Sequence, residues 1–207
     1  MKALAPRLPL ALAVLVVASC ATLDLVEVWR DPKYARAPIS RILVIAVLPS
    51  EAMRAASERA LAKAFADRGF AASTGSAVFP PGPLDRERAL AYVRREDVDL
   101  VVVQRLAKET RRDYVPPKFL YVPPAPYFGG WYGYYGYAYG AAYSPGYYTD
   151  STPVLAETNV YATRASPETL VWSGSSRTFD FRSAGEAAAS VAALVADDLV
   201  RAGILVH

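Results

Sequence analysis

The chain of 207 residues is long enough for one or two domains, and 53% of its residues are hydrophobic while 21% are charged. This balance excludes a disordered polymer and a minimal disulfide scaffold, and it favours one compact core. Lys and Arg total 23 against 20 Asp and Glu, a net charge of +3. Two of the basic residues lie in an amino-terminal segment that we expect to be removed, so the charge gives no case for nucleic acid binding.

Residues 1–19 have the features of a secretory signal peptide. Lys2 and Arg7 precede an apolar run over 8–17, and the small residues Ala18 and Ser19 follow it directly before Cys20. This run is too short to span a bilayer well. Cys20 is the only cysteine of the chain, so the sequence excludes an internal disulfide.

The residues Val17-Ala18-Ser19-Cys20 resemble the bacterial lipobox. The resemblance implies cleavage before Cys20, a diacylglycerol on its sulfur, and a fatty acid such as palmitate on its new amine. Each buried methylene contributes roughly 0.8 kcal/mol, so more than one acyl chain makes membrane attachment stable. By resemblance to lipoproteins of Gram-negative bacteria, Ala21 lacks the Asp that retains such proteins in the inner membrane, which implies the outer membrane. An ordinary signal peptide with an incidental cysteine is the alternative.

The mature chain is expected to consist of a lipidated tether over 20–40 and an α/β domain over 41–207. Within the tether, the alternation over 26–29 is typical of a short edge strand, which Pro32 would end. The continuous β-branched run 42–48 predicts a strand that is buried on both faces.

A helix is predicted next, over 50–68, because apolar residues recur there at helical spacing. Ser50 is a suitable N-cap, and Gly69 is a suitable stop. Residues 70–73 form a candidate second strand, and a shorter helix is predicted over 84–96.

Residues 100–107 predict another buried strand. The segments 154–164 and 169–179 have strand character and are separated by a turn sequence, which indicates an antiparallel hairpin. A capping box opens a final amphipathic helix over 183–203. The expected fold is therefore a single α+β or α/β domain with a mixed sheet, in the order β-α-β-α-β-insertion-β-β-α, with its helices mainly on one face.

An insertion over 112–150 interrupts this pattern and holds 11 of the 14 Tyr, 6 of the 12 Gly and 6 of the 16 Pro. Few aliphatic residues are available there to form a core, and glycine raises the entropy lost on ordering, so we expect a flexible excursion. The alternatives are a partner contact and ordered self-association through aromatic strands. The candidate contact residues are Trp131, Tyr132, Tyr134, Tyr135, Tyr137 and Tyr139.

Catalytic motifs are scarce in this sequence. His207 is the only histidine and the last residue, which argues against a catalytic triad and against His/Cys metal sites, and no cofactor motif is found. A carboxylate pair for glycan hydrolysis is an alternative, and its candidates are Asp97, Asp99, Glu157 and Asp180. For the first two, a helix stop and a polar entry to a strand is the structural interpretation.

Several features together resemble a family of small proteobacterial lipoproteins whose domain has no assigned function. They are the lipobox at Cys20, Trp29 followed by Asp31-Pro32, the strand 42–48 leading into a helix with Glu58, and the segment Leu170-Val171-Trp172-Ser173. The order of elements is also similar to the amino-terminal domain of the Tol-Pal translocation protein, the curli secretion component and penicillin-binding-protein activators. These resemblances imply partner binding and transfer no catalytic residue.

The sequence thus favours a non-enzymatic lipoprotein held by Cys20 on the periplasmic face of the outer membrane, which binds a protein or cell-wall partner through the insertion and needs no cofactor or metal. The alternatives are an envelope glycan hydrolase that uses two carboxylates and a surface-exposed adhesive or matrix lipoprotein.

Overall fold

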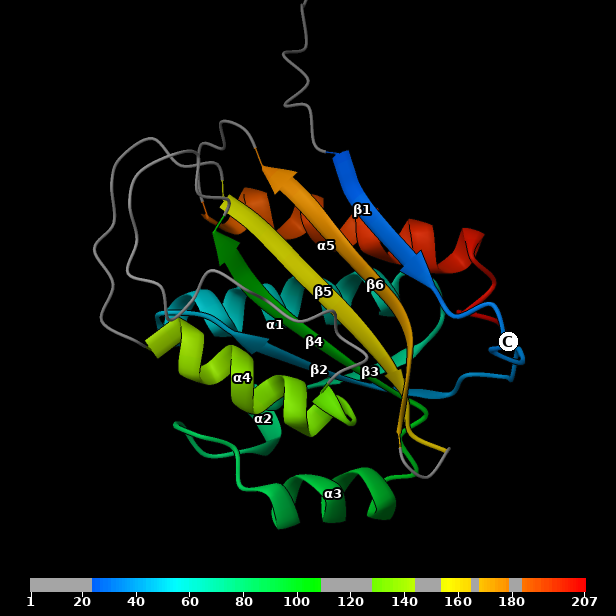
Figure 1. Cartoon of the computed structure of the whole chain (residues 1–207), viewed down its shortest axis with the longest axis horizontal. Helices are drawn as coiled ribbons and strands as arrows, with labels where there is room; N and C mark the ends of the chain where they lie inside the picture. Colours follow the sequence, from blue (N-terminus) through cyan, green and yellow to red (C-terminus); the bar gives the residue numbers. More distant parts are fainter. Residues whose placement is uncertain (1–23, 109–127, 144–153, 165–167, 179–183) are drawn as a thin grey trace, which may run out of the picture.

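A computed structural model describes residues 24–108, 128–143, 154–164, 168–178 and 184–207 of the chain. Its centre is a six-stranded sheet in the order β1-β6-β5-β4-β2-β3 (Figure 1). The strands are β1 (Asp24–Arg30), β2 (Arg41–Val47), β3 (Ala71–Thr74), β4 (Leu100–Lys108), β5 (Val154–Ala162) and β6 (Thr169–Thr178). The helices are α1 (Glu51–Ala66), α2 (Gly75–Val78), α3 (Arg86–Arg95), α4 (Trp131–Tyr143) and α5 (Ala184–Arg201).

The sheet is mixed, as the sequence predicts. Strands β3, β2 and β4 run parallel and are joined through helices, whereas β4, β5, β6 and β1 pair antiparallel. The predicted hairpin is β5–β6, and the predicted strands and helices outside the insertion occur in the expected order. The single α+β domain with a mixed sheet is therefore confirmed.

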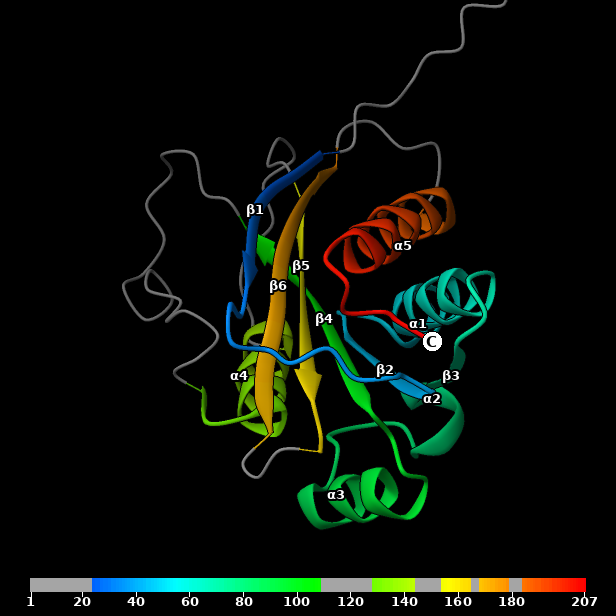
Figure 2. The same ribbon diagram turned by 90° about the vertical axis from the view of Figure 1, so that its right-hand side faces the viewer.

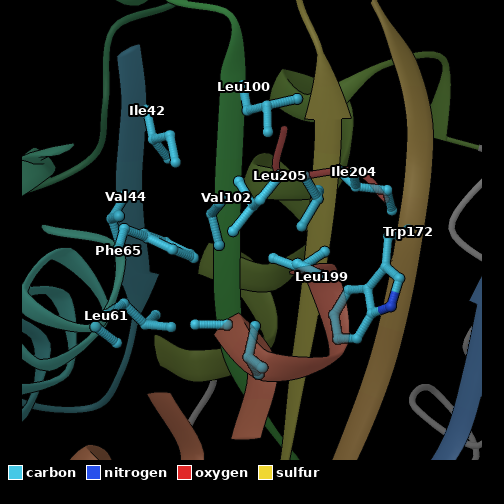
Figure 3. Close-up of a cluster of buried hydrophobic side chains, with 14 of the residues drawn as sticks. Ile42, Val44, Leu61, Phe65, Leu100, Val102, Trp172, Leu199, Ile204 and Leu205 are labelled. Carbon is cyan, nitrogen blue, oxygen red and sulfur yellow. The ribbon is translucent and has the colours of Figure 1, made fainter. Parts of the chain in front are cut away.

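One face of the sheet is covered by the two longest helices, α1 and α5. Alternate residues of β2 and β4, such as Val44 and Val102, pack there against Leu61 and Phe65 of α1 and Leu199 of α5 (Figure 3). Trp172 from β6 is fully buried in this layer, and its ring lies over Gly174, where a Cβ atom would overlap it. This face forms an aromatic and aliphatic core of the usual kind.

The opposite face carries a second core, which agrees with the predicted burial of 42–48 on both faces. The other residues of the same strands, such as Leu43 and Val101, pack against α4 and against Ala89 and Val93 of α3. Figure 2 shows α4 on one side of the sheet and α1 and α5 on the other. The expectation of helices mainly on one face holds for the two longest only, because strands that are apolar on both faces need cover on both.

The helix ends follow from local chemistry. Ser50 Oγ accepts a hydrogen bond from Met53 N at 3.2 Å at the start of α1, and Asp85 does the same for Arg88 N at 2.8 Å at the start of α3. Gly203 follows α5 with φ +68°, a conformation that favours glycine.

Strand β1 belongs to the domain, so the predicted boundary at residue 41 is wrong. It pairs along its length with β6, and Arg30 at its end donates two hydrogen bonds of 2.9 Å to Asp198 of α5. Asp198 also accepts from Trp172 Nε1 at 2.9 Å. The domain therefore includes residues 24–30, which lie before the predicted boundary and within the tether expected over 20–40.

Candidate functional site on helix α4

The centre of the insertion is a helix that packs in the core, which contradicts the expected flexible excursion. Trp131 and Tyr134 are fully buried, Tyr135 is 5% exposed, and Ala138 is again fully buried. These positions follow the spacing i, i+3, i+4, i+7, so they form one face of α4. They contact the second core together with residues of β2, β4 and β5.

The signal for this helix was present in the sequence but was obscured by its composition. Gly133, Gly136 and Gly140 each disfavour a helix by about 1 kcal/mol relative to Ala. All three lie on the outer, exposed face, where no side chain is needed for packing. Counting aromatic residues by helical period instead of by composition would have identified the buried face.

Beneath α4, a buried polar cluster joins the helix to the sheet. The antiparallel register of β4 and β5 places Arg105 directly opposite Glu157, and the two form an ion pair. The hydroxyl of Tyr134 donates to Glu157 Oε1 at 2.5 Å and accepts from Arg105 Nε at 2.9 Å. Asn159 Nδ2 donates to the same carboxylate at 2.9 Å. Both charges are thus paired, as buried charges require.

The ionisation of the buried tyrosines shows what this cluster does chemically. Burial raises the pKa of Tyr134 well above its usual 10.0; Glu157 raises it further, and Arg105 opposes the shift. Burial, followed by the effect of Glu157, also raises the pKa of Tyr161. The hydroxyl of Tyr134 consequently stays protonated at neutral pH and serves as a fixed hydrogen-bond donor, not as an acid or a nucleophile.

A second set of contacts ties α4 to the segment before α3. The hydroxyl of Tyr135 accepts from Leu84 N at 2.9 Å, and the hydroxyl of Tyr132 donates to Leu84 O. Burial raises the pKa of Tyr135 to about 12. Tyrosine is therefore used in α4 both for packing and for satisfying the backbone of a neighbouring loop.

The six predicted contact residues separate into two groups. Trp131, Tyr134 and Tyr135 are committed to the core, so the expectation of an accessible surface is wrong for these three. The other three are partly exposed and flank the exposed glycines: Tyr132, Tyr137 and Tyr139. We call the surface made by these three tyrosines with Gly133, Gly136 and Gly140 the outer α4 face. Cys20, the predicted lipidation site, lies outside the described residues.

The candidate carboxylates are not brought together as a pair among the described residues. Asp99 is 2% exposed; it accepts from Ser40 N at 2.6 Å and Arg41 N at 3.0 Å, and it pairs with Arg164. Asp97 follows α3 with φ +48°. Asp97 therefore lies at a helix stop and Asp99 at the polar entry to a strand, the structural roles expected for these two residues. Glu157 is paired with Arg105, and Asp180 lies outside the described residues.

Glu58 is a buried carboxylate that the sequence marked only through the family resemblance. It is 1% exposed on α1 and accepts from Ala46 N at 3.0 Å and from Ser76 N at 2.6 Å. It therefore joins α1 to β2 and to the start of α2, and two backbone donors satisfy its charge.

Within the described ranges, no group of three His, Cys, Asp or Glu side chains is placed to hold a metal ion. None of the helices in the same ranges has the length and apolar character needed to cross a membrane. His207 stacks on Phe70, with ring centroids 4.3 Å apart, at the end of the chain.

No protein-family model and no curated protein matches this chain. Its fold is similar to two structures of PelC dodecamers from Paraburkholderia phytofirmans, one of which is a single-residue variant. The variant is 14% identical over 85% of this chain and 96% of that chain, with a TM-score of 0.46. The second is 13% identical over 84% of this chain and 96% of that chain, with a TM-score of 0.45.

Proposed function

We propose that this protein is a non-enzymatic lipoprotein, anchored through Cys20 on the periplasmic side of the outer membrane, which binds another envelope component. The anchor is supported by the sequence before Cys20, a cysteine that has no other cysteine to pair with. The binding role is supported by the outer α4 face. This face is the observation that carries the proposal.

The outer α4 face is suited to binding because it is both accessible and fixed in place. Three glycines expose the helix backbone, and the rings of Tyr137 and Tyr139 stand beside them partly exposed. Tyr134 and Trp131 on the inner side anchor the same helix in the core. Tyrosines held in place lose little entropy on binding and offer an apolar ring with a polar tip, a composition enriched at interfaces.

The anchor would hold the domain close to the membrane. Cys20 precedes Asp24, the first residue of β1, by four positions. An extended chain spans at most about 3.6 Å per residue, so the Cα atom of Asp24 would lie within about 14 Å of the Cα atom of the lipidated cysteine. The domain would therefore meet partners in the layer directly next to the bilayer.

Lipidation is tested by mass spectrometry of the amino-terminal peptide of the protein extracted from cell envelopes. We expect a peptide that begins at Cys20 and carries the mass of acyl chains, and a Cys20→Ala variant that is neither acylated nor retained in the membrane fraction. An unmodified cysteine in a processed, soluble protein would overturn the anchor and leave the binding role to be tested separately.

The binding role is tested by photo-crosslinking in intact cells. A photoreactive residue replaces Gly136, where a side chain meets nothing within 4 Å, and the control carries it at Ala189, exposed on α5 on the other side of the sheet. We expect a discrete crosslinked product from position 136 only. Equal products from both positions, or none from either, would contradict the proposal.

A matched pair of substitutions separates binding from folding. Gly136→Lys places a long cation on the outer α4 face, whereas Gly136→Ala adds a single methyl group at the same open position. We expect the lysine variant to lose the crosslinks formed by a probe at position 137 and the alanine variant to keep them, with both variants folded. Deleting the whole insertion would not make this distinction, because it would remove Trp131 and Tyr134 from the core.

A further inference from the structure

Strand β1 presents apolar side chains to solvent at an open edge of the sheet. Val26 is 39% exposed, and Val28 and Trp29 are each 42% exposed. They are three of the four large hydrophobic residues exposed in the described part of the chain, the fourth being Val200. Among the described strands, β1 pairs with β6 alone, so no other described strand lies beside its outer backbone donors and acceptors (Figure 1).

The two edges of the sheet differ in how well they are protected against pairing. The opposite edge strand, β3, is four residues long and passes directly into α2. β1 has seven residues, and its register is irregular only between Leu25 and Glu27. From Glu27 to Arg30 the strand is regular and ready to pair. Exposed apolar edge strands of this kind favour strand addition, and proteins normally shorten, charge or cover them.

We propose that β1 pairs antiparallel with β1 of a second copy of this chain, with the twofold axis at Val28. The exposed charge of the strand favours this register. Because residues opposite one another in an antiparallel pair point to the same face, the axis must pass through one residue and its equivalent. An axis at Glu27 would set two carboxylates opposite each other, and an axis at Trp29 would set Glu27 against Asp31 of the second copy.

An axis at Val28 avoids both repulsions. It places Val28 opposite Val28 of the second copy and Glu27 opposite Trp29, so each exposed apolar side chain of 28–29 gains a neighbour. Arg30 is held by Asp198 of its own chain and brings no unpaired charge to the contact. An axis at Val26 would leave Trp29 beyond the paired stretch.

No other part of the amino-terminal segment is available to cover this edge if Cys20 is the first residue of the processed protein, because only 21–23 then lie between it and β1. In the dimer, Asp24 of one copy and Asp24 of the second copy would lie roughly 27 Å apart along the paired strands. Both anchors reach one bilayer when these strands run along its surface. The pairing itself does not depend on the anchor, since it uses β1 alone.

The register is tested by disulfide crosslinking of the full chain in the periplasm, with Val28→Cys as the test and Val26→Cys as the matched control. Both positions are valines on the same strand with similar exposure. An axis at Val28 sets the two introduced cysteines directly opposite, with Cα atoms about 4.5 to 5.5 Å apart, within the range of a disulfide. Equivalent residues at position 26 would be about 13 Å apart along the strands, which is too far.

We expect a reducible dimer on a non-reducing gel from Val28→Cys, and little or none from Val26→Cys, from Val200→Cys or from the unaltered protein. In sedimentation, the unaltered protein should be a dimer and Val28→Lys a folded monomer, with the same far-ultraviolet circular dichroism as the unaltered protein. Equal crosslinking at positions 26 and 28, no crosslinking at 28, or a crosslinked product with a different protein would each overturn the proposal. Loss of lipidation at Cys20 would not, so the two proposals fail independently.

Discussion

Replacing Tyr134 with Phe tests whether α4 is held by the polar cluster beneath it. The change keeps the buried ring and removes only the hydroxyl, which donates to Glu157 at 2.5 Å and accepts from Arg105 at 2.9 Å. Leaving a buried polar partner unsatisfied costs about 1 to 3 kcal/mol, and more for a charged group. Because both partners here are charged, we expect a loss of about 2 to 3 kcal/mol in the free energy of unfolding.

The loss is measured by urea denaturation of the purified mature protein, followed by far-ultraviolet circular dichroism. At about 2 to 4 °C per kcal/mol for a domain of this size, the melting temperature should fall by about 4 to 12 °C. Tyr137→Phe is the control, because Tyr137 lies on the same helix with its ring centroid 5.3 Å from the guanidinium carbon of Arg105, and no hydrogen bond joins these two side chains among the described residues. Equal effects of the two substitutions, within about 0.5 kcal/mol, would refute the reasoning.

Individual contacts in the structure lead to four further predictions. Gly136→Ala should raise the free energy of unfolding by about 0.5 to 1 kcal/mol in a urea titration, whereas Gly133→Ala should lower it, because a Cβ there would overlap a backbone carbonyl. Asp198→Ala should lower the melting temperature, because it releases Arg30 on β1 and Trp172 on β6 together. Breaking a buried pair costs about 3 to 5 kcal/mol, and the partial exposure of Arg30 reduces this loss; a melting temperature equal to that of the unaltered protein would contradict the prediction. The free energy of unfolding should also fall at high pH, because burial raises the pKa of Tyr135 in the folded protein to about 12 from 10.0. The stabilisation by protonated Tyr135 is complete below pH 10 and is lost as the pH rises through 12, which urea titrations at several alkaline pH values would detect. Tyr161→Phe, which removes a buried hydroxyl without a hydrogen-bond partner among the described residues, should leave stability at neutral pH unchanged or increased and should lessen its fall at high pH.

The elements predicted best are those whose hydrophobic period and caps agree. The run 42–48 became β2, buried on both faces, and Ser50 caps α1 as expected. The final helix begins at Ala184 and ends before Gly203, again close to prediction. In these segments local propensity, pattern and cap chemistry point to the same structure, so no information from distant residues was needed.

The candidate site was predicted less well, for a reason specific to its composition. Glycine and tyrosine repeats over 129–140 indicated flexibility, whereas the sheet stabilises a helix there by burying Trp131, Tyr134 and Tyr135. Helical propensity is a weak preference that burial of large aromatic surfaces outweighs. The tertiary structure decided that three of the six candidate aromatic residues, Trp131, Tyr134 and Tyr135, face inward.

By itself, the sequence determined the order of the strands and helices outside the insertion and the mixed character of the sheet, since each depends on neighbours in the chain. Only the tertiary structure decided that β1 joins the sheet as an edge strand beside β6, that Arg105 meets Glu157 across two strands, and that α4 covers the second face. These outcomes depend on residues far apart in the sequence, whose pairing is set by strand register and by the need to cover both faces of a doubly apolar sheet.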